Sequence, residues 1–547
     1  MSLPVPGTVH LVDLANNLAV KHGEGKKDIV LIPQPSSDPN DPLNWGWWRK
    51  NHNRLWQCLW MISGCAIISS LSPAYLLIQE DTGIPIANLS TGIGLMYLFL
   101  GWGNLIFQPL ALNFGRRPVL IFSLLGTALM VLWSAYIQSS GVWYLNRILM
   151  GIFFAPVETL VEIVVTDLSF THERGFHMAI YQWTLWNGAL LAPIPAGYIA
   201  ENHGWRWIQW TGTILGLSVT FLMVFFFEET MYFRQTIRDE FVGENIQETD
   251  ISSQVSQSEK SKGPVDSKAQ LSSTSNSESP IEQAEVWLTP KQSFLRNLRL
   301  WNLRAPDQPR TPWKSVLLPL ILLRYPAMLF GGLLVGSVLS WFNVLNATTA
   351  EVFGNAPYNF TTNQIGLIYL ASVIGATIGC FLSGTLSDML SEWLARRNNG
   401  IKEPEHRLWI GAIALVVHPA GCLLYGIGAT QQIHWVGLAF GIGLMSMCLP
   451  IGSNIGITYV IDSYKEVAGE GVVSVILVRN TIGFAFAYAI TPMIKDLGRQ
   501  NSFILVAVLG AAFWVMCLVF IWGGKSWRRN SAKTYWHLVE GHGLHAH

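Results

Sequence analysis

Residues 143–167 read WYLNRILMGIFFAPVETLVEIVVTD, a run long enough to cross a bilayer, which requires about 20 mainly apolar residues. The run nevertheless contains Arg147, Glu158 and Glu162. A charge at the centre of a membrane helix costs about 2.5–3.5 kcal/mol on insertion scales. These three side chains are therefore expected to face protein or a water-filled cavity rather than lipid.

In a helix, Gly151, Ala155, Glu158 and Glu162 fall on one face, with Arg147 one turn before Gly151. A rise of 1.5 Å per residue places the two carboxyls about 6 Å apart along the axis. Two acids this close in a poor dielectric do not both ionise easily, so one is expected to hold a proton unless a cation is bound. The pattern favours a proton- or cation-binding site in which Arg147 tunes the glutamates. The alternative is a structural polar cluster that locks this helix to its neighbours.

The composition indicates a polytopic membrane protein. Half of the 547 residues are hydrophobic, only 13% are charged, and long apolar runs recur. The formal net charge is zero, so no nucleic-acid partner is expected. The first 50 or so residues are polar, which argues against a cleavable signal peptide. The six cysteines lie in apolar segments without metal-ligand spacing, so they are expected to pack rather than to bind a metal.

The apolar runs predict an all-α membrane protein with twelve transmembrane helices in two six-helix bundles. The expected spans are residues 54–78, 90–112, 118–138, 143–167, 177–200, 208–228, 315–342, 364–386, 408–428, 434–458, 471–494 and 502–523. The expected parts are a flexible cytoplasmic N-terminal segment, an N-terminal bundle, a cytoplasmic, partly disordered linker, a C-terminal bundle and a cytoplasmic tail. They cover residues 1–53, 54–232, 233–312, 313–523 and 524–547.

Charge and glycosylation motifs predict the same orientation. Arginine and lysine are concentrated in the loops that lie inside if the N-terminus is cytoplasmic, including the pairs Arg116–Arg117 and Arg396–Arg397. Three N-x-S/T sequons fall in loops on the opposite side, where glycosylation occurs, at Asn88, Asn346 and Asn359. We therefore expect a multi-pass protein with both termini in the cytoplasm.

The two halves repeat one feature between their second and third spans. Residues 108–118 read QPLALNFGRRP, and residues 384–398 read GTLSDMLSEWLARRN. Each places a short loop with paired arginines at the cytoplasmic end of a helix. Duplicated six-span halves are typical of a transporter that rocks around a central site.

With these features the sequence resembles the major facilitator superfamily, over roughly residues 38–530. It is most similar to fungal twelve-span drug:proton antiporters and to yeast-type polyamine and cation transporters. The superfamily's loop motif, G-x-L-A-D-R-x-G-R-R, corresponds to residues 108–117, with Leu112 in place of its Asp, and the second-half copy keeps Asp388. The resemblance implies a cytoplasmic gate formed by Arg116, Arg117 and Asp388. For the two arginines, the alternative is a topology anchor.

Two further motifs support the resemblance. The fourth-span motif R-x-x-x-G is present as Arg147 and Gly151. The fifth-span antiporter motif, G-x-x-x-G-P-x-x-G-G, corresponds to Gly188, Ala192, Pro193, Ala196 and Gly197. Proline kinks a helix and small residues let helices approach closely, so this segment can seal a leak path or act as a hinge. Plain packing is the alternative.

Several polar or aromatic residues inside apolar helices are candidates to line a central cavity. They are Trp183, Trp186, Asn187, Asn343, Asn454, Arg479 and Asn480. Arg479 could pair with a carboxylate or with an anionic group of a substrate. The alternative is that these side chains only join helices through hydrogen bonds.

No motif in the sequence predicts an enzyme. A phosphate-binding G-x-x-x-x-G-K-[ST] loop, a nucleophile elbow and a metal-ligand cluster are all absent, so we expect no catalytic residue, no cofactor and no metal. Transport energy is then expected to come from an ion gradient.

The main hypothesis is a monomeric, proton-coupled transporter that exports a small organic molecule, such as a drug, toxin or secondary metabolite, across the plasma membrane. Its partners would be the small molecule, protons and the lipid bilayer, with Glu158 and Glu162 taking up the proton. The alternative is uptake of organic cations such as polyamines, since two carboxylates on one face suit an ammonium group. A third hypothesis is a non-transporting nutrient sensor.

Overall fold

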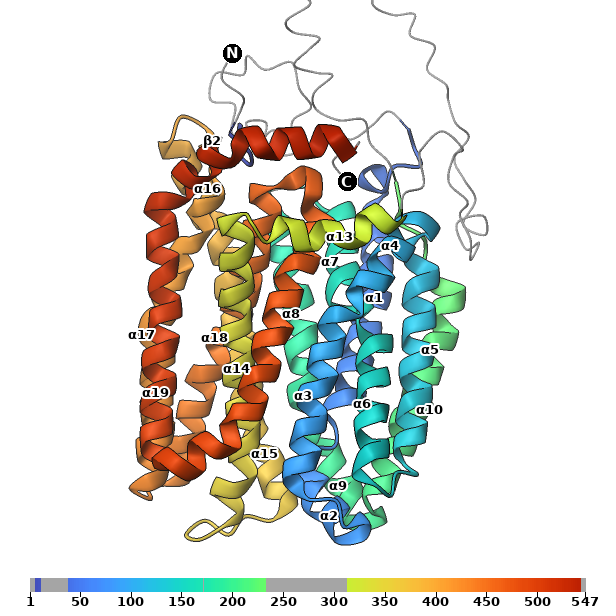
Figure 1. Cartoon of the computed structure of the whole chain (residues 1–547), viewed down its shortest axis with the longest axis vertical. Helices are drawn as coiled ribbons and strands as arrows, with labels where there is room; N and C mark the ends of the chain where they lie inside the picture. The colour runs from blue at the N-terminus through green and yellow to red at the C-terminus, as the bar shows by residue number, and fades with distance from the viewer. Residues whose placement is uncertain (1–4, 11–37, 171, 233–311, 543–547) are drawn as a thin grey trace, which may run out of the picture.

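The computed structural model describes residues 5–10, 38–170, 172–232 and 312–542, which are almost entirely helical (Figure 1). The helices of the first half are α1 (Trp47–Ser69), α2 (Tyr75–Thr82), α3 (Ile86–Trp102), α4 (Asn104–Phe114), α5 (Arg116–Ser134), α6 (Ser140–Phe154), α7 (Pro156–Asp167), α8 (Arg174–Leu191), α9 (Pro193–His203) and α10 (Trp205–Phe226). Those of the second half are α13 (Pro312–Leu322), α14 (Pro326–Gly354), α15 (Thr362–Phe381), α16 (Ser387–Arg397), α17 (Gly411–Thr430), α18 (Trp435–Ser463) and α19 (Ala468–His542).

Short elements connect these helices. They are the short helical segments η1 (Pro42–Asn44), η2 (Ser72–Ala74), η4 (Leu382–Leu386), η5 (Pro404–Ile410) and η6 (Lys465–Val467), and the strands β1 (Val9–His10) and β2 (Ile401–Lys402). The two strands pair in antiparallel fashion.

The described helices account for twelve passages across a membrane. Ten of the described segments are long and apolar enough to span one. The last, Lys465–Glu540, holds two passages, because Gly498 leaves the helical conformation (φ 73°, ψ 164°) and the chain turns back (Figure 1). The predicted fifth span, 177–200, is more polar, is not among the ten, and is formed by α8 and α9. The predicted fold class is confirmed.

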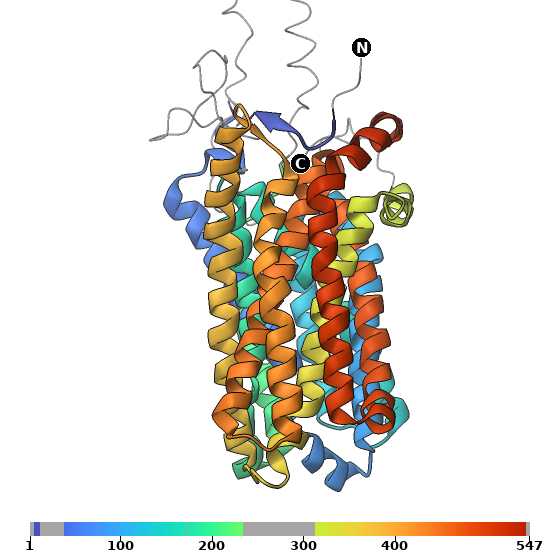
Figure 2. The ribbon, with the colours of Figure 1, turned by 90° about the vertical axis from the view of Figure 1, so that its left-hand side faces the viewer.

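The two halves lie side by side, with most helices running along the long axis of the molecule (Figures 1 and 2). One end carries β1, α13 and the last part of α19, and we call it the terminus end. The opposite end carries α2 and α9. We call it the sequon end, because the chain that holds the three N-x-S/T motifs turns there.

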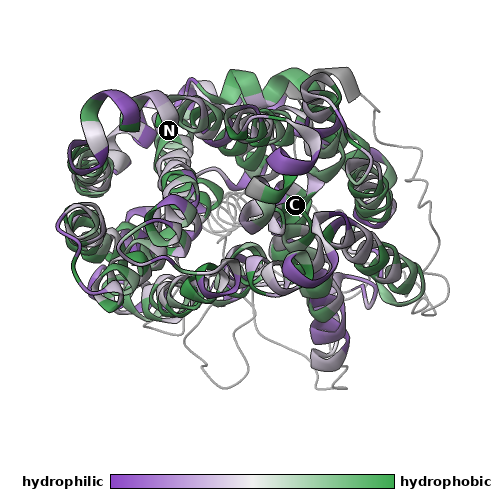
Figure 3. Cartoon of the chain, turned by 90° about the horizontal axis from the view of Figure 1, so that it is seen from below, coloured by the Kyte–Doolittle hydropathy of each residue, from purple (hydrophilic) through white to green (hydrophobic). Residues whose placement is uncertain are grey.

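The outer surface carries large hydrophobic side chains along the helices of both halves. Seen along the helix axes, hydrophobic residues recur in both groups of helices (Figure 3). Several such side chains are more than 60% exposed, among them Phe221, Ile374, Phe381, Val416 and Phe440. An apolar surface of this extent requires a nonaqueous environment. The protein is therefore a multi-pass membrane protein.

The seventh predicted span, 315–342, starts too early. The structure divides this region into α13 and α14, and α13 lies across the terminus end rather than along the long axis (Figure 1). The break comes at Tyr325, whose extended backbone (ψ 126°) precedes Pro326. A residue before proline is disfavoured in the helical region, and proline is favoured at the first position of a new helix. The spanning helix therefore begins at Pro326.

Two segments near the ends of the chain, residues 5–10 and the last part of α19, are ordered at the terminus end. The expected tail, 524–547, is helical through His542, and this last part of α19 lies along the terminus end (Figure 1). Residues 5–10 are also ordered, although the N-terminal segment was expected to be flexible. Val9 pairs with Lys402, and the Pro6 carbonyl accepts a hydrogen bond from Arg528. Residues 5–10 are therefore docked on the second half.

Close helix packing at Gly151 gives a first testable prediction. A Cβ atom at Gly151 would lie 2.3 Å from the Met96 carbonyl oxygen of α3, whereas Gly141 in the same helix has nothing within 4 Å. We expect Gly151→Ala to lower the free energy of unfolding by about 1–3 kcal/mol, since α3 and α6 must move apart. Tryptophan fluorescence during heating measures the change.

The matched control is Gly141→Ala. Both substitutions gain the same helix propensity, worth up to about 1 kcal/mol, so their difference isolates packing. Equal melting temperatures for the two variants would contradict close packing at Gly151.

Candidate functional site

The two halves are joined inside the protein by an ion pair. Glu158 of α7 contacts the Arg479 guanidinium of α19, and each side chain is only 4% exposed. The second oxygen of the same carboxylate accepts a hydrogen bond of 3.1 Å from the Asn480 side chain. A buried ion pair is tolerated only when its remaining polar atoms are satisfied. Both Glu158 oxygens are thus engaged by the second half.

A cavity of about 50 Å³ adjoins this pair between the two halves. Glu158 and Arg479 line it together with residues of α1, α3, α6, α8 and α14. Its wall includes four aromatic rings, those of Tyr97, Phe154, Trp186 and Phe342. The Trp186 and Phe342 rings, one from each half, meet edge to face with centroids 5.3 Å apart. The cavity is therefore a small, largely aromatic chamber with one ion pair.

Glu162 lies one helical turn beyond Glu158 and is fully buried. Neither of its carboxyl oxygens has a hydrogen-bond partner of good geometry in the described part of the chain, although the Tyr181 hydroxyl adjoins the carboxyl. The same hydroxyl donates a hydrogen bond of 3.4 Å to the Glu158 carbonyl oxygen. An isolated buried carboxylate is very costly, so Glu162 requires either a proton or a nearby cation at this position.

Arg147 does not have the expected relation to the two glutamates. Its guanidinium donates to the Ser134 hydroxyl at 2.8 Å and lies over the Trp143 ring, 3.9 Å from the centroid. The cation that reaches Glu158 is Arg479, from the other half. The helical pattern of one span could not reveal a partner supplied by a helix more than 300 residues away.

The other candidate cavity residues divide into two groups. Trp186 and Arg479 line the chamber, and Asn480 holds Glu158. The remaining four lie outside its lining and make hydrogen bonds: Trp183 to the Thr377 hydroxyl of the other half, Asn187 to the Trp183 carbonyl, Asn343 to the Gly483 carbonyl and Asn454 to the Ser383 carbonyl. These four side chains therefore form hydrogen bonds between helices or within one helix.

The antiporter-like segment coincides with a helix break. α8 ends at Leu191 and α9 begins at Pro193, with Ala192 between them. A Cβ at Gly188 would lie 3.1 Å from the Ile62 backbone of α1, and one at Gly366 of α15 would lie 3.3 Å from the Pro193 carbonyl. The segment therefore packs closely within the first half and against the second. Gly197 is buried in α9.

A cluster of charged side chains joins the halves at the terminus end. This charge cluster consists of Arg174 from the first half and Asp388, Lys402, Arg407 and Asp462 from the second. The Asp462 carboxylate is 3.1 Å from Arg174, 3.0 Å from Arg407 and 3.5 Å from Lys402. Arg174 is thus held by an acid of the opposite half.

Asp388 provides a second link across the halves. Its carboxylate is 2.7 Å from Arg407 and accepts a hydrogen bond of 2.8 Å from the Phe176 backbone N–H, in the first turn of α8. A carboxylate at a helix N-terminus is favoured by the helix dipole. Burial, together with nearby Arg407, lowers the pKa of Lys402 to about 8, although Asp462 acts in the opposite direction.

Arg116 and Arg117 contact two acids of the first half, Asp167 and Glu229. The Arg116 side chain is 3.5 Å from the Asp167 carboxylate. The backbone N–H groups of Arg116 and Arg117 each donate a hydrogen bond of 3.0 Å to the Glu229 carboxylate. Arg116 is therefore paired with an acid of its own half, at the end of α7. Leu112, which stands where the family motif has Asp, is buried and apolar.

The three sequons lie at the sequon end. Asn88 is in the first turn of α3, Asn346 is in the later part of α14, and Asn359 is an exposed residue between α14 and α15 with φ 49°. The Asn346 side chain accepts a hydrogen bond of 2.9 Å from the Tyr369 hydroxyl. Their glycosylation remains a prediction.

Sequence reasoning missed several of these groups. Asp462 lies just beyond the predicted tenth span, and Tyr181 was one aromatic residue among many in an apolar helix. An available signal was the concentration of Lys402 and Arg407 in the same predicted loop region as Asp388, which called for a further acid. Within the described ranges, no group of three or more His, Cys, Asp or Glu residues could hold a metal ion.

Twelve passages in two halves, with a small chamber and an ion pair between them, define the fold of a secondary transporter. The sequence profile of the Major Facilitator Superfamily matches residues 58–488. The chain belongs to this family, and it is a secondary transporter rather than an enzyme.

Fungal relatives extend over nearly the whole chain. It is 32% identical to "Uncharacterized MFS-type transporter C1271.10c" of Schizosaccharomyces pombe, over 97% of this chain and 94% of the relative. It is 25% identical to "Protein HOL1" of Saccharomyces cerevisiae, over 97% and 96%. It is 26% identical to "MFS transporter cpaT" of Aspergillus oryzae, over 93% and 95%.

Two solved structures share the fold. One is the crystal structure of the human organic anion transporter MFSD10 (TETRAN), with a TM-score of 0.54, 15% identity and coverage of 86% of this chain and 99% of that one. The other is the proton:xylose symporter XylE, with a TM-score of 0.56, 11% identity and coverage of 87% and 97%. At these identities the likeness bears on the fold alone.

Proposed function

We propose that this protein is a proton-coupled antiporter that exports a small organic molecule with a positive charge across the plasma membrane. The observation that supports the proposal best is the Glu158–Arg479 pair at the chamber between the halves. A carboxylate held by a cation of the opposite half can exchange that partner for a cationic cargo, and this exchange couples binding to movement of the halves.

The chamber favours an organic cation as cargo. Glu158 supplies a counter-charge, and Tyr97, Phe154, Trp186 and Phe342 supply aromatic faces. Each favourable contact between a cation and a ring is worth about 0.5–2 kcal/mol. An anionic cargo would have to displace Glu158 from Arg479 and leave a buried carboxylate unpaired, which is unfavourable.

In this proposal the proton is carried by Glu162, whereas Glu158 binds the cargo. Glu162 is buried without a cationic partner of its own among the described residues and holds a proton when Glu158 is paired with Arg479. When the halves rearrange and Arg479 leaves, both acids lie beside one site, where the cargo's charge and a proton compete. Release of the Glu162 proton then accompanies binding of the cationic cargo.

The orientation in the proposal follows from charge and sequons. Arginine-rich loops and both ordered terminal segments lie at the terminus end, and the sequons lie at the opposite end. We therefore assign the terminus end to the cytoplasm and the sequon end to the outside of the cell.

The test uses purified protein in liposomes with an acidic interior. We expect these vesicles to accumulate tetraphenylphosphonium or spermidine while their interior becomes less acidic, as a pH-sensitive dye reports. Glu162→Gln is expected to reduce this gradient-driven accumulation by about 100-fold, because the proton-carrying group is lost. Exchange of labelled for unlabelled cation without a gradient should persist.

The matched control is Glu201→Gln, the same change at an exposed position near the end of α9. Its accumulation should equal that of the unchanged protein. Accumulation that requires an acidic exterior would instead favour uptake of organic cations by symport. The absence of any flux of either cation, in either gradient, would contradict the proposed cargo class.

A further inference from the structure

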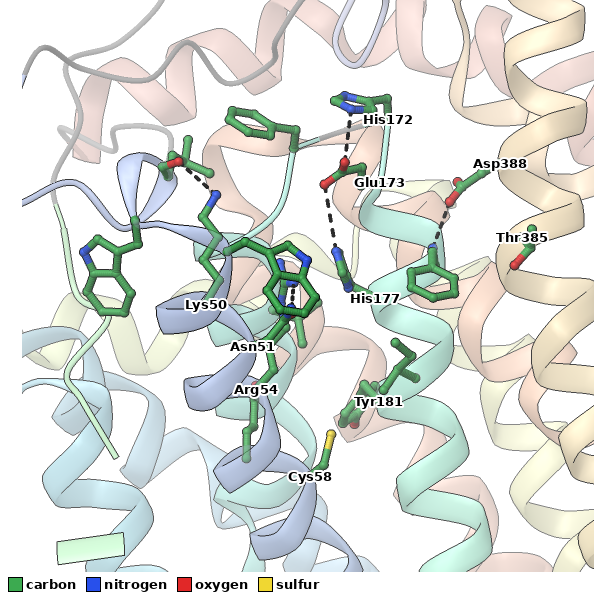
Figure 4. A pocket seen from close by; sticks show the side chains of 18 of the residues that line it. Lys50, Asn51, Arg54, Cys58, His172, Glu173, His177, Tyr181, Thr385 and Asp388 are labelled. Carbon is green, nitrogen blue, oxygen red and sulfur yellow. Dashed lines mark hydrogen bonds and ion pairs between the residues drawn. The ribbon is translucent and has the colours of Figure 1, made fainter. Parts of the chain in front are cut away.

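A large cavity lies at the terminus end and is separate from the central chamber. It has a volume of about 1400 Å³ and lies between α1, α8 and the start of α16. Figure 4 shows His172 and Glu173 at its outer part and Cys58 and Tyr181 at its inner end. We call it the terminus-end pocket.

The walls of this pocket are suited to water. Lys50, Arg54, His177, Glu173 and Asp388 all line it, so ionisable groups from both halves face its interior. Charged groups at a cavity wall favour water there, because water fills the hydrogen-bonding positions that their protein partners leave open. The lining of the pocket is therefore suited to hold water from the terminus end toward the middle of the first half.

Tyr181 stands between this pocket and the buried acids. It lines the terminus-end pocket, is only 2% exposed, and its hydroxyl adjoins the Glu162 carboxyl. Glu162 itself is fully buried and does not line the pocket. Its titratable and charged neighbours are Tyr181 from α8, Glu158 from its own helix and Arg479 from α19.

Glu158 offers no equivalent route from the central chamber. One of its oxygens is held by Arg479 and the other by Asn480. A proton that enters from the chamber would therefore have to compete with the Arg479 guanidinium for the Glu158 carboxylate. Of the three titratable or charged neighbours of Glu162 named above, only Tyr181 also lines the pocket.

We propose that Tyr181 is the relay through which Glu162 exchanges protons with the terminus-end pocket. The Tyr181 hydroxyl gives its proton to the Glu162 carboxylate and takes one from water in the pocket, and the reverse sequence discharges Glu162. One O–H bond forms for each that breaks, and no electron is transferred. The inference rests on the proposed function for its biological role, but the relay is measurable without any cargo.

Infrared spectroscopy of the full-length protein in liposomes provides the test. The C=O band of the protonated Glu162 carboxyl is identified as the band lost in Glu162→Gln, and its shift is followed after transfer into D₂O. We expect Tyr181→Phe, which keeps the ring and removes the hydroxyl, to slow this shift by about 100-fold or more. Unchanged exchange in Tyr181→Phe would overturn the relay.

The native Cys58 gives a second measurement that does not depend on a variant at Tyr181. Cys58 lines the pocket beside Tyr181 and is partly exposed, while the other five cysteines are buried. A small cationic methanethiosulfonate should react with Cys58 and fill the inner end of the pocket. Exchange at Glu162 should then slow in the unchanged protein and not in Cys58→Ser.

The outcomes separate the two proposals. A missing Glu162 band would show that Glu162 holds no proton, and this would overturn both the relay and the proposed proton coupling. A band that exchanges equally fast in the unchanged protein, in Tyr181→Phe and after Cys58 labelling would overturn only the relay, leaving the antiport proposal to its own transport assay.

Discussion

Glu158→Gln is expected to lower the free energy of unfolding by about 3–5 kcal/mol and to abolish cation transport. The substitution leaves the buried Arg479 guanidinium without its counter-charge, and arginine cannot lose its proton to relieve the cost. Arg479→Met is expected to cost less, because Glu158 can take up a proton. The double variant should recover most of the stability and none of the transport. Thermal melting of the three purified variants, monitored by tryptophan fluorescence, measures their stability, and the liposome assay measures their transport.

The protein contains a matched exposed pair for comparison. Glu351 and Arg499 are 2.9 Å apart at the sequon end, with side chains 54% and 29% exposed. Glu351→Gln should cost at most about 1 kcal/mol, because exposed ion pairs contribute little. If Glu158→Gln is no more destabilising than Glu351→Gln, the Glu158–Arg479 pair does not join the halves in the folded protein.

Asp462→Asn is expected to open the terminus end. The charge cluster contains three cations and two carboxylates, and Asp462 is the carboxylate that Arg174, Lys402 and Arg407 share, so its removal takes one ion-pair partner from each of them. The lost pairing is worth about 3–5 kcal/mol, enough to invert a two-state population between closed and open forms. Spin labels at Trp48 and Met389, one in each half and 81% and 63% exposed, should report a longer distance.

Asp496→Asn is the control, since it makes the same chemical change at an exposed position of α19. The label distance should remain that of the unchanged protein. An unaltered distance in Asp462→Asn as well would mean that the charge cluster does not hold the terminus end closed.

The sequence predicted the fold well, because long apolar runs report membrane spans directly. Boundaries were less accurate where the hydropathy did not change, as at Pro326, where a helix across the terminus end and a spanning helix are both apolar. Order at residues 5–10 was not predictable from a polar segment. It depends on a strand partner and an arginine that lie about 400 and 520 residues further along the chain.

The candidate site was predictable only in part. Arg147, Glu158, Glu162 and Arg479 stood out because charged residues are costly in apolar helices. Spacing within one helix suggested Arg147 as the partner of the glutamates, whereas tertiary packing brings Arg479 to Glu158. Hydrogen bonds to backbone carbonyls are made by the side chains of Asn187, Asn343 and Asn454. Such a bond satisfies a polar side chain inside an apolar helix without any water-filled cavity.

The pairing of β1 with β2 attaches a segment near the amino terminus to the second half of the protein. Residues 5–10 lie against the second half, while Lys50 at the start of α1 holds the Leu43 carbonyl at 2.9 Å within the first half. The polypeptide thus passes from one half to the other near its beginning as well as through residues 233–311. If the chain were cut within residues 233–311, the amino-terminal fragment would remain attached to the second half by the pairing of β1 with β2 as well as by the ion pairs between the halves.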